Sequence, residues 1–170
     1  MRRVLILGSG AAGKTTFARK LAAIIKLPLI HLDALYWKPG WQKTPTKEWE
    51  GVVRDLIGTE EWIIDGSYFG TLLMRLERAD TAIYLDYSRW VSFWHVLKRR
   101  VQYRDRGCVR PGLPEGCPEQ IFGTYLKWLW KYPKRDRVNV MKLLAAFGKS
   151  HDVVILRSMK EAERYLKSLQ

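Results

Sequence analysis

The sequence predicts an α/β fold built on a parallel β-sheet. Two observations predict it: short apolar runs typical of strands alternate with longer segments of helical periodicity, and a glycine-rich loop follows the first apolar run. Parallel strands need crossover connections, which are usually helices, so this alternation favours a parallel sheet. The length of 170 residues is that of one domain, and we expect a single domain over residues 1–170.

The N-terminal element is an apolar run over residues 3–7, which is typical of a central strand buried on both faces. The next eight residues, Gly8 to Thr15, fit the pattern G-x-x-x-x-G-K-[ST]. Residues 16–25 then carry apolar side chains at helical spacing. A strand, a glycine-rich turn and a helix in this order predict a phosphate-binding loop (P-loop).

In such a loop, glycines let the backbone curl until successive N–H groups and the helix N-terminus point at one anion. We expect ATP to be bound by Gly8, Ser9, Gly10, Ala11, Ala12, Gly13, Lys14, Thr15 and Thr16. Lys14 should also act in catalysis by reaching the β- and γ-phosphates, and the Thr15 hydroxyl should bind Mg²⁺. The alternative is a glycine-rich turn that binds nothing.

Four more strands and six more helices follow from the same patterns. The strands are expected over residues 27–32, 62–65, 81–86 and 152–156. The helices are expected over residues 46–57, 69–77, 89–104, 118–131, 135–147 and 160–169. Three glycines and three prolines between residues 106 and 118 indicate a long irregular loop, so a lid insertion is placed at about residues 105–118.

Three aspartates end predicted strands: Asp33, Asp65 and Asp86. Ligands of open α/β sheets bind beyond the carboxyl ends of the strands, where these side chains should lie. We expect Asp65 to hold Mg²⁺ together with Thr15, although Asp86 fits the same pattern. Asp33 is the candidate to accept the proton of an attacking hydroxyl. The alternative for each is a turn aspartate that binds local N–H groups.

Aromatic residues are abundant, with 8 Trp in the chain. Tyr36, Trp37 and Trp41 follow Asp33 in a predicted loop and should form the wall of an acceptor pocket. Four tryptophans on predicted helix or strand faces are expected in the core instead; they are Trp49, Trp62, Trp90 and Trp94. His31 is expected to be a sheet residue without a catalytic role.

Several arginines lead into and through the irregular loop and could close over a triphosphate as a lid. They are Arg99, Arg100, Arg104, Arg106 and Arg110. We expect Arg100 and Arg104 to act in catalysis and Arg99 and Arg137 to bind the nucleotide; the alternative is a solvated surface role. Two further arginines, Arg75 and Arg78, could bind an anionic acceptor or lie on the surface.

The net charge of +13 is concentrated between residues 98 and 142, where 12 Lys and Arg face 4 Asp and Glu. Such a surface suits nucleic acid, a membrane surface or phosphorylated metabolites, and composition does not choose among them. No apolar run approaches the roughly 20 residues of a membrane span, and the N-terminus does not resemble a signal peptide. A cytoplasmic protein without a membrane partner is expected, and Cys108 and Cys117 should be free thiols.

Four segments together resemble the bacterial DNA topology modulation proteins, and the resemblance runs from about residue 2 to about residue 157. The segments are residues 8–15, 31–41, 62–68 and 115–119. This resemblance implies a place in the adenylate-kinase-like branch of the P-loop NTPases. It therefore implies a three-layer fold of the nucleotide and shikimate kinase type, with a five-stranded parallel sheet in the order 2-3-1-4-5, an arginine-rich lid, ATP and Mg²⁺.

The resemblance also bears on the site. Asp65-Gly66 resembles the Asp-Gly of adenylate kinases that helps to position the metal, and Asp33 lies where shikimate-kinase-like enzymes place a substrate-binding carboxylate. Here Ser67-Tyr68 follows, in place of the Phe-Pro-Arg that handles the monophosphate in adenylate kinases. A nucleoside monophosphate is therefore not the default acceptor.

These observations predict an ATP-dependent kinase that transfers the γ-phosphoryl group to a small anionic or hydroxyl-bearing acceptor. The alternative is a nucleotide-dependent, nucleic-acid-binding regulator that affects DNA topology, for which the basic surface is the physical argument. The sequence carries no helix-turn-helix or zinc-finger signature. It also lacks Asn-Lys-x-Asp, a guanine-selecting signature, so ATP is expected rather than GTP.

Overall fold

The structure is a computed structural model that describes residues 1–103, 112–117 and 123–170. Its centre is a five-stranded parallel sheet in the order β2-β5-β1-β6-β7. The strands are Leu29–His31 (β2), Trp62–Asp65 (β5), Arg3–Gly8 (β1), Thr81–Leu85 (β6) and Asp152–Leu156 (β7). Counted within the sheet, this is the order 2-3-1-4-5, and the expected topology is confirmed.

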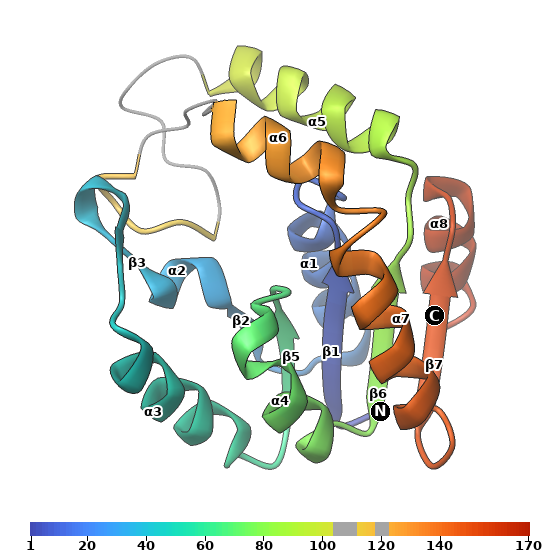
Figure 1. Cartoon of the computed structure of the whole chain (residues 1–170). Coiled ribbons are helices and arrows are strands. Elements are labelled where there is room, and N and C mark those ends of the chain that lie inside the picture. The colour runs from blue at the N-terminus through green and yellow to red at the C-terminus, as the bar shows by residue number, and fades with distance from the viewer. Residues whose placement is uncertain (104–111, 118–122) are drawn as a thin grey trace.

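Helices cover both faces of the sheet, and the fold has three layers (Figure 1). The helices are Lys14–Ile25 (α1), Leu32–Tyr36 (α2), Thr46–Ile57 (α3), Leu72–Arg78 (α4), Arg89–Gln102 (α5), Gly123–Lys131 (α6), Asp136–Phe147 (α7) and Met159–Lys167 (α8). Short 3₁₀ turns span Pro39–Trp41 (η1) and Phe69–Thr71 (η2), and Trp37–Lys38 (β3) pairs antiparallel with Gln42–Lys43 (β4).

The central strand β1 contributes to two hydrophobic cores because its side chains alternate between the two faces of the sheet. Leu5 and Leu7 pack in the core with residues of α3, α4 and α7. Val4 and Ile6 pack in the other core with residues of α1 and α8. All four side chains are buried, which explains why this strand reads as a continuous apolar run.

The observed elements differ from the predicted ones mainly at their ends. The second strand stops at His31, and the chain turns directly into α2, which is a five-residue helix that the sequence did not indicate. The helix after the P-loop begins at Lys14, two residues before the predicted start. The segment predicted as one helix over residues 69–77 begins as the 3₁₀ turn η2 before α4. Most of the predicted lid falls outside the described residues.

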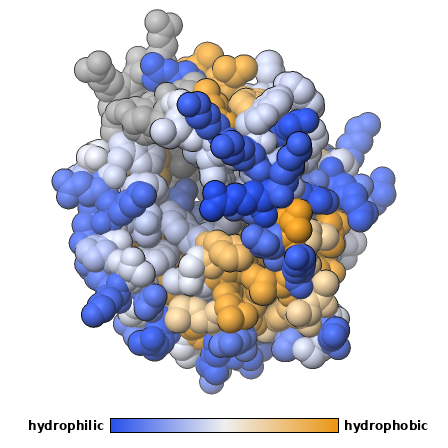
Figure 2. Space-filling view, viewed as in Figure 1, coloured by the Kyte–Doolittle hydropathy of each residue, from blue (hydrophilic) through white to orange (hydrophobic). Residues whose placement is uncertain are grey.

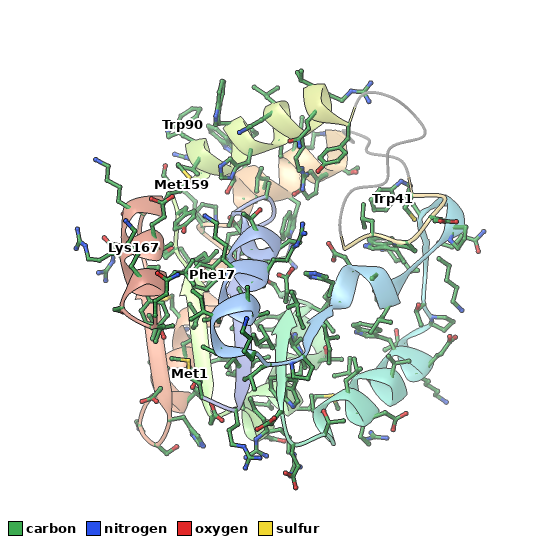
Figure 3. The ribbon with its side chains drawn as sticks, turned by 180° about the vertical axis from the view of Figure 1, so that it is seen from behind. Met1, Phe17, Trp41, Trp90, Met159 and Lys167 are labelled. Atoms are coloured by element: carbon green, nitrogen blue, oxygen red, sulfur yellow. The ribbon has the colours of Figure 1, made fainter. Side chains whose placement is uncertain are left out.

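The tryptophans divide into two groups. Trp49 and Trp62 are buried, as predicted. Trp90 and Trp94 are 64% and 65% exposed, so their expected place in the core is wrong. The reason is that α5 turns its opposite face, with Ser92 and Val96, toward the body of the protein. Figure 3 shows Trp90 at the outer edge of the molecule.

The surface combines a charged periphery with an apolar area. Figure 2 shows hydrophobic residues gathered over α4 and α7, where Leu73 and Val138 are exposed. Hydrophilic side chains surround this area (Figure 2). Within the described residues, no helix is long and apolar enough to cross a membrane.

Candidate functional site

One large cavity, of about 1230 Å³, lies beyond the carboxyl ends of the central strands. Gly8 ends β1 and Asp65 ends β5, and both line this cavity. Its walls come from the P-loop and α1, from α2 and the segments that follow α2 and β5, and from α5 and α6, and residues of α7 and α8 also contribute. The cavity therefore occupies the place where open α/β sheets bind their ligands.

The P-loop curls through backbone conformations that most residues avoid. Gly13 has a φ of 83° and Ala11 a φ of 57°, both in the left-handed region. At Gly8 a Cβ atom would lie 2.8 Å from the backbone oxygen of Leu85. This close approach of β1 and β6 accounts for the first glycine of the motif.

All but one of the predicted loop residues line the cavity; the exception is Ser9, which lines a smaller pocket. The loop residues that line the cavity are Gly8, Gly10, Ala11, Ala12, Gly13, Lys14, Thr15 and Thr16. Lys14 bends back over the loop, and its Nζ donates to the backbone oxygens of Ser9 at 2.9 Å and Gly8 at 3.4 Å. The ammonium group is thus held close to the backbone of the glycine-rich loop, an arrangement that would suit an anion.

Thr15 and Asp65 meet at the base of the cavity. The Thr15 hydroxyl donates to Oδ2 of Asp65 at 2.8 Å, and Nδ1 of His31 lies 3.0 Å from the same oxygen. The sheet brings these strand ends together: Asp65 of β5 lies beside Ile6 of β1 on one side and beside His31 of β2 on the other. The sequence predicted that Thr15 and Asp65 act together, but it did not predict that His31 contacts Asp65.

A hydroxyl beside a carboxylate fits Mg²⁺, which prefers hard oxygen ligands and usually takes only one or two from the protein. Within the described residues, no group of three or more His, Cys, Asp or Glu side chains could hold a metal by itself. The pair of Thr15 and Asp65 is therefore suited to a metal that takes its remaining ligands from phosphate and water.

Asp33 lies on the other side of the cavity, on α2. Its Oδ1 accepts a hydrogen bond of 2.7 Å from the hydroxyl of Tyr68, which follows β5. Burial raises the pKa of Tyr68, and the negative charge of Asp33 raises it further. The phenol therefore stays protonated at neutral pH and donates to the carboxylate. The sequence did not predict this role for Tyr68.

An aromatic cluster stands beside Asp33. The ring of Tyr36 lies 5.0 Å from Trp37, 5.0 Å from Trp49 and 4.6 Å from Tyr68, and Trp37 lies 5.3 Å from Trp41. Tyr36, Trp37, Trp41 and Tyr68 line the cavity, whereas Trp49 is buried behind them. The three aromatic residues predicted for the pocket wall are thus brought together there.

Arg75 on α4 has neither of the roles considered for it. Its side chain is fully buried, and its guanidinium donates to the backbone oxygens of Gly66, Ser67 and Tyr68 at 2.8 Å and of Thr71 at 3.2 Å. Burial lowers the pKa of Arg75 to about 9, so the cation persists at neutral pH. Arg75 fixes the segment that carries Tyr68, although no local sequence signal indicates this.

The helix α5 packs against the P-loop from above. The hydroxyls of Ser9 and Ser92 lie 2.9 Å apart, and Nδ1 of His95 lies 2.8 Å from the backbone oxygen of Ala11. The spacing of Ser92 and His95 places both on the inner face of the helix. These contacts hold the P-loop from the side opposite α1.

The helix α6 also packs against this loop, at Gly10. A Cβ atom at Gly10 would lie 2.5 Å from the Tyr125 hydroxyl and 2.6 Å from the Trp128 ring. The rings of Tyr125 and Trp128 stack on each other, with centroids 5.7 Å apart. The middle glycine of the loop therefore leaves space for an aromatic pair that sequence analysis did not assign to the site.

The predicted arginines do not all reach the cavity. Arg99 lines it from α5, whereas Arg100 is exposed on the same helix and is not part of the lining. Arg104, Arg106 and Arg110 lie outside the described residues, so their predicted roles stay predictions.

Arg137, predicted to bind the nucleotide, instead forms a two-pronged ion pair with Asp86, with distances of 2.7 and 2.6 Å. The hydrogen bonds that Arg137 donates to the Asp86 carboxylate raise the pKa of Arg137. Both residues line a smaller pocket on the other side of Ser9 and neither lines the large cavity. Asp86 is therefore engaged by an arginine, away from the pair of Thr15 and Asp65.

Solved structures similar to this chain include two shikimate kinases. The enzyme from Bacteroides thetaiotaomicron aligns with a TM-score of 0.56 and 19% identity, over 99% of this chain and 96% of that one. The enzyme from Acinetobacter baumannii, solved in complex with shikimate, aligns with a TM-score of 0.58 and 14% identity, over 99% and 90%. At these identities the likeness shows the fold, which is the P-loop fold of shikimate kinases.

Among curated proteins, the chain matches the ATPase subunit HslU of an ATP-dependent protease. The sequences from Helicobacter pylori and Helicobacter acinonychis are each 30% identical to it over 79 residues, which is 46% of this chain. The match spans only 17% of the length of these relatives. No family model matches the chain, so the resemblance to the DNA topology modulation proteins stays a prediction.

Proposed function

We propose that this protein is an ATP-dependent kinase that transfers the γ-phosphoryl group to a hydroxyl of a small acceptor. One observation carries the proposal: three groups of complementary chemistry line a single cavity. They are the cationic P-loop with Lys14, the pair of Thr15 and Asp65, and Asp33 with its partner Tyr68. The fold shared with shikimate kinases supports the same class of reaction.

On the phosphate side, the backbone N–H groups of the P-loop and the ammonium of Lys14 would bind the triphosphate. Thr15 and Asp65 would hold Mg²⁺, which when bound supplies positive charge to the phosphate oxygens. His31 would keep the Asp65 carboxylate oriented through its 3.0 Å contact. Arg99 would add positive charge from α5. Arg100 and Arg104 are the candidates to bring further positive charge to the phosphates when ATP is bound.

On the acceptor side, the hydroxyl oxygen of the acceptor would attack the γ-phosphorus and form the new P–O bond. The bond between the γ-phosphorus and the bridging oxygen would break, and ADP would leave with that electron pair. The proton of the hydroxyl would pass to Asp33, which Tyr68 orients. Most of the rate enhancement would come from positioning and charge stabilisation, as in other phosphoryl transfers.

The test is Mg²⁺-dependent ADP production from ATP across a panel of nucleosides, nucleotides, sugars, shikimate-like alcohols and DNA, with GTP as the second donor. Stimulation by one small molecule is expected. Lys14→Ala should lower kcat/KM by about 10²- to 10³-fold. The matched control is Lys160→Ala, which replaces an exposed lysine on α8 and should leave kcat/KM unchanged.

Two results would overturn the proposal. The first is ATP binding without turnover in the presence of any small molecule. The second is turnover stimulated by DNA alone, which would favour the nucleic-acid-binding regulator.

ATP and reduced thiols such as buried Cys117 are typical of the cytoplasm, where we propose that the protein works.

A further inference from the structure

The helix α5 carries apolar side chains along its outer side. We call Trp90, Trp94, Leu97 and Val101 the α5 stripe, and they are 64%, 65%, 58% and 78% exposed. Steps of four, three and four residues place these side chains on one face of a helix. Single apolar residues are normal on protein surfaces, but a row of four on one helix marks an interaction surface.

The α5 stripe cannot turn toward the core, because the opposite side of α5 is already packed. Ser92 and Val96 are buried on that side. The hydroxyl of Ser92 and Nδ1 of His95 contact the P-loop at 2.9 and 2.8 Å. These contacts fix the rotation of the helix about its axis, so the stripe faces away from the protein. Trp90 accordingly lies at the outer edge of the molecule in Figure 3.

The neighbouring helix α6 widens this apolar surface. The two helices lie side by side (Figure 1), and Trp130 of α6 is 49% exposed. The Trp130 ring lies 5.9 Å from the ring of Trp90 and 6.0 Å from that of Phe93. The guanidinium of Arg89 lies over the Trp130 ring, 4.3 Å from its centroid. The stripe and Trp130 therefore form one surface that combines aromatic rings with a cation.

Further cationic side chains border the same surface. On α5, Lys98 is exposed, and at about 100° per residue it lies at the margin of the stripe. On α6, Lys127 and Lys131 are exposed. Lys127 precedes Trp130 by three residues, so the two side chains share one face of α6. An apolar centre with cationic margins suits a partner that is apolar inside and anionic at its surface.

An anionic lipid surface has this composition. Tryptophan rings favour the headgroup level of a membrane, and aliphatic side chains enter the boundary of the acyl chains below it. Lysine and arginine side chains contact the anionic headgroups themselves. The α5 stripe, Trp130 and the flanking lysines offer all three kinds of contact on one exposed surface.

Two other occupants fit this surface less well. A second copy of this chain would bring two sets of cationic margins together, which is unfavourable. A nucleic acid would meet the cations and stack on the tryptophans, but Leu97 and Val101 would gain little from it. Val101 is the most exposed residue of the stripe, so an aliphatic contact is an essential part of the match.

We infer that the α5 stripe and Trp130 form a docking surface for an anionic lipid surface, on which α5 lies in the interface. A protein without a membrane partner was expected from the lack of a spanning segment, but a helix that lies in the interface needs no span. The inference goes beyond the proposed function, because none of its residues is assigned to phosphoryl transfer.

Vesicles of two compositions test this inference. The full chain is sedimented with vesicles of phosphatidylcholine and with vesicles of an equal mixture of phosphatidylcholine and phosphatidylserine. We expect binding to the mixture to be tighter by about tenfold or more, because each lysine near the membrane adds attraction to anionic lipid. Added salt should weaken this binding. Tryptophan fluorescence should shift to shorter wavelength as the exposed rings leave water.

Two leucine variants identify the apolar part of the surface. Leu97→Ser should weaken binding to the mixed vesicles by about tenfold, because an apolar side chain no longer enters the lipid. Leu73→Ser on α4 is the matched control, since Leu73 is 59% exposed and lies outside the stripe. It should leave vesicle binding unchanged. Thermal unfolding of both variants separates a lost contact from lost structure.

Two double variants identify the cationic part. Lys127→Gln combined with Lys131→Gln should weaken binding to the mixed vesicles by about tenfold or more. Lys47→Gln combined with Lys149→Gln removes the same net charge from exposed positions, on α3 and after α7. This control should change binding by less than about twofold, because charges far from the membrane are screened.

Three results would overturn the inference. The first is that the protein binds neither kind of vesicle, or binds both equally. The second is that Leu97→Ser and Leu73→Ser weaken binding to the same extent. The third is that another occupant takes the surface. A dimer in sedimentation velocity that Leu97→Ser dissociates would indicate a second copy, and a single-stranded oligonucleotide that displaces the protein from the mixed vesicles would indicate nucleic acid.

Discussion

The two sides of the cavity are built in different ways. On the phosphate side, all residues from Gly8 to Thr16 except Ser9 line the cavity, and they belong to one continuous segment of the chain. On the acceptor side, Asp33 and Tyr36 of α2 contact Tyr68, which follows β5, and these two segments meet only in the folded protein. The phosphate side is therefore a local structure, whereas the acceptor side depends on distant contacts.

This difference has a consequence for function. Local loops such as the P-loop bind the part of the substrate that many enzymes share, because the triphosphate is always the same. A binding surface that is assembled from separate segments can differ in its side chains between proteins of one fold without disturbing the sheet. We therefore expect changes on the phosphate side to affect nucleotide binding, and changes on the acceptor side to affect the acceptor alone.

The largest effect that would test this separation is expected for Asp33→Asn. If Asp33 accepts the proton of the acceptor hydroxyl, kcat should fall by about 10²- to 10⁴-fold. The KM for ATP should stay within about twofold of the original value, because Asp33 does not belong to the P-loop. Steady-state kinetics with ATP varied at saturating acceptor measures both. A large rise in the KM for ATP would show that the two sides are not separate.

Arg75→Leu is expected to give the next largest effect, on stability. Four backbone oxygens would lose their donor, and we expect the free energy of unfolding to fall by about 3 kcal/mol. Arg78→Leu, a change of the same kind at an exposed position of α4, should cost less than about 0.5 kcal/mol. Urea denaturation measures both values. Equal losses in the two variants would contradict the role assigned to Arg75.

The contrast between the two sides also explains what could be predicted from the sequence. The parallel sheet and the arrangement of the P-loop around the cavity were predictable, because apolar runs and a glycine-rich motif are local signals. The order of the strands, in contrast, was implied only by the resemblance to a known family. The contact of Thr15 with Asp65 followed from the expectation that adjacent strands end at one edge.

The contacts that were not predicted have no local signal. Nothing near Tyr68 indicates that its hydroxyl reaches Asp33, 35 residues away. Arg75 carries a charge that normally marks a surface residue, and only the fold shows that it is buried. Trp90 and Trp94 fit a helical pattern on α5, but that pattern does not say which face of a helix meets the core.

Tyr68→Phe should have an intermediate effect confined to the acceptor side. The phenol hydrogen bond to the Asp33 carboxylate is lost while the ring and its contacts with Tyr36 remain. We expect kcat/KM for the acceptor to fall by about tenfold, the usual scale for one hydrogen bond to a charged group. Tyr36→Phe is the matched control, and a fall of the same size there would show that any tyrosine of the wall matters equally.

Arg137→Gln is expected to give the smallest effect. It tests whether Arg137 binds the nucleotide, as the sequence predicts, or only pairs with Asp86, as the structure shows. The ion pair with Asp86 is partly solvated, since the Arg137 side chain is 40% exposed, so its loss should lower the free energy of unfolding by about 1 kcal/mol. The KM for ATP should not change, because Arg137 does not line the large cavity. A tenfold rise in the KM for ATP would instead mean that Arg137 leaves Asp86 to bind phosphate when the nucleotide is present. In that case the phosphate side would also depend on a distant contact, and the distinction between a local and an assembled side would fail.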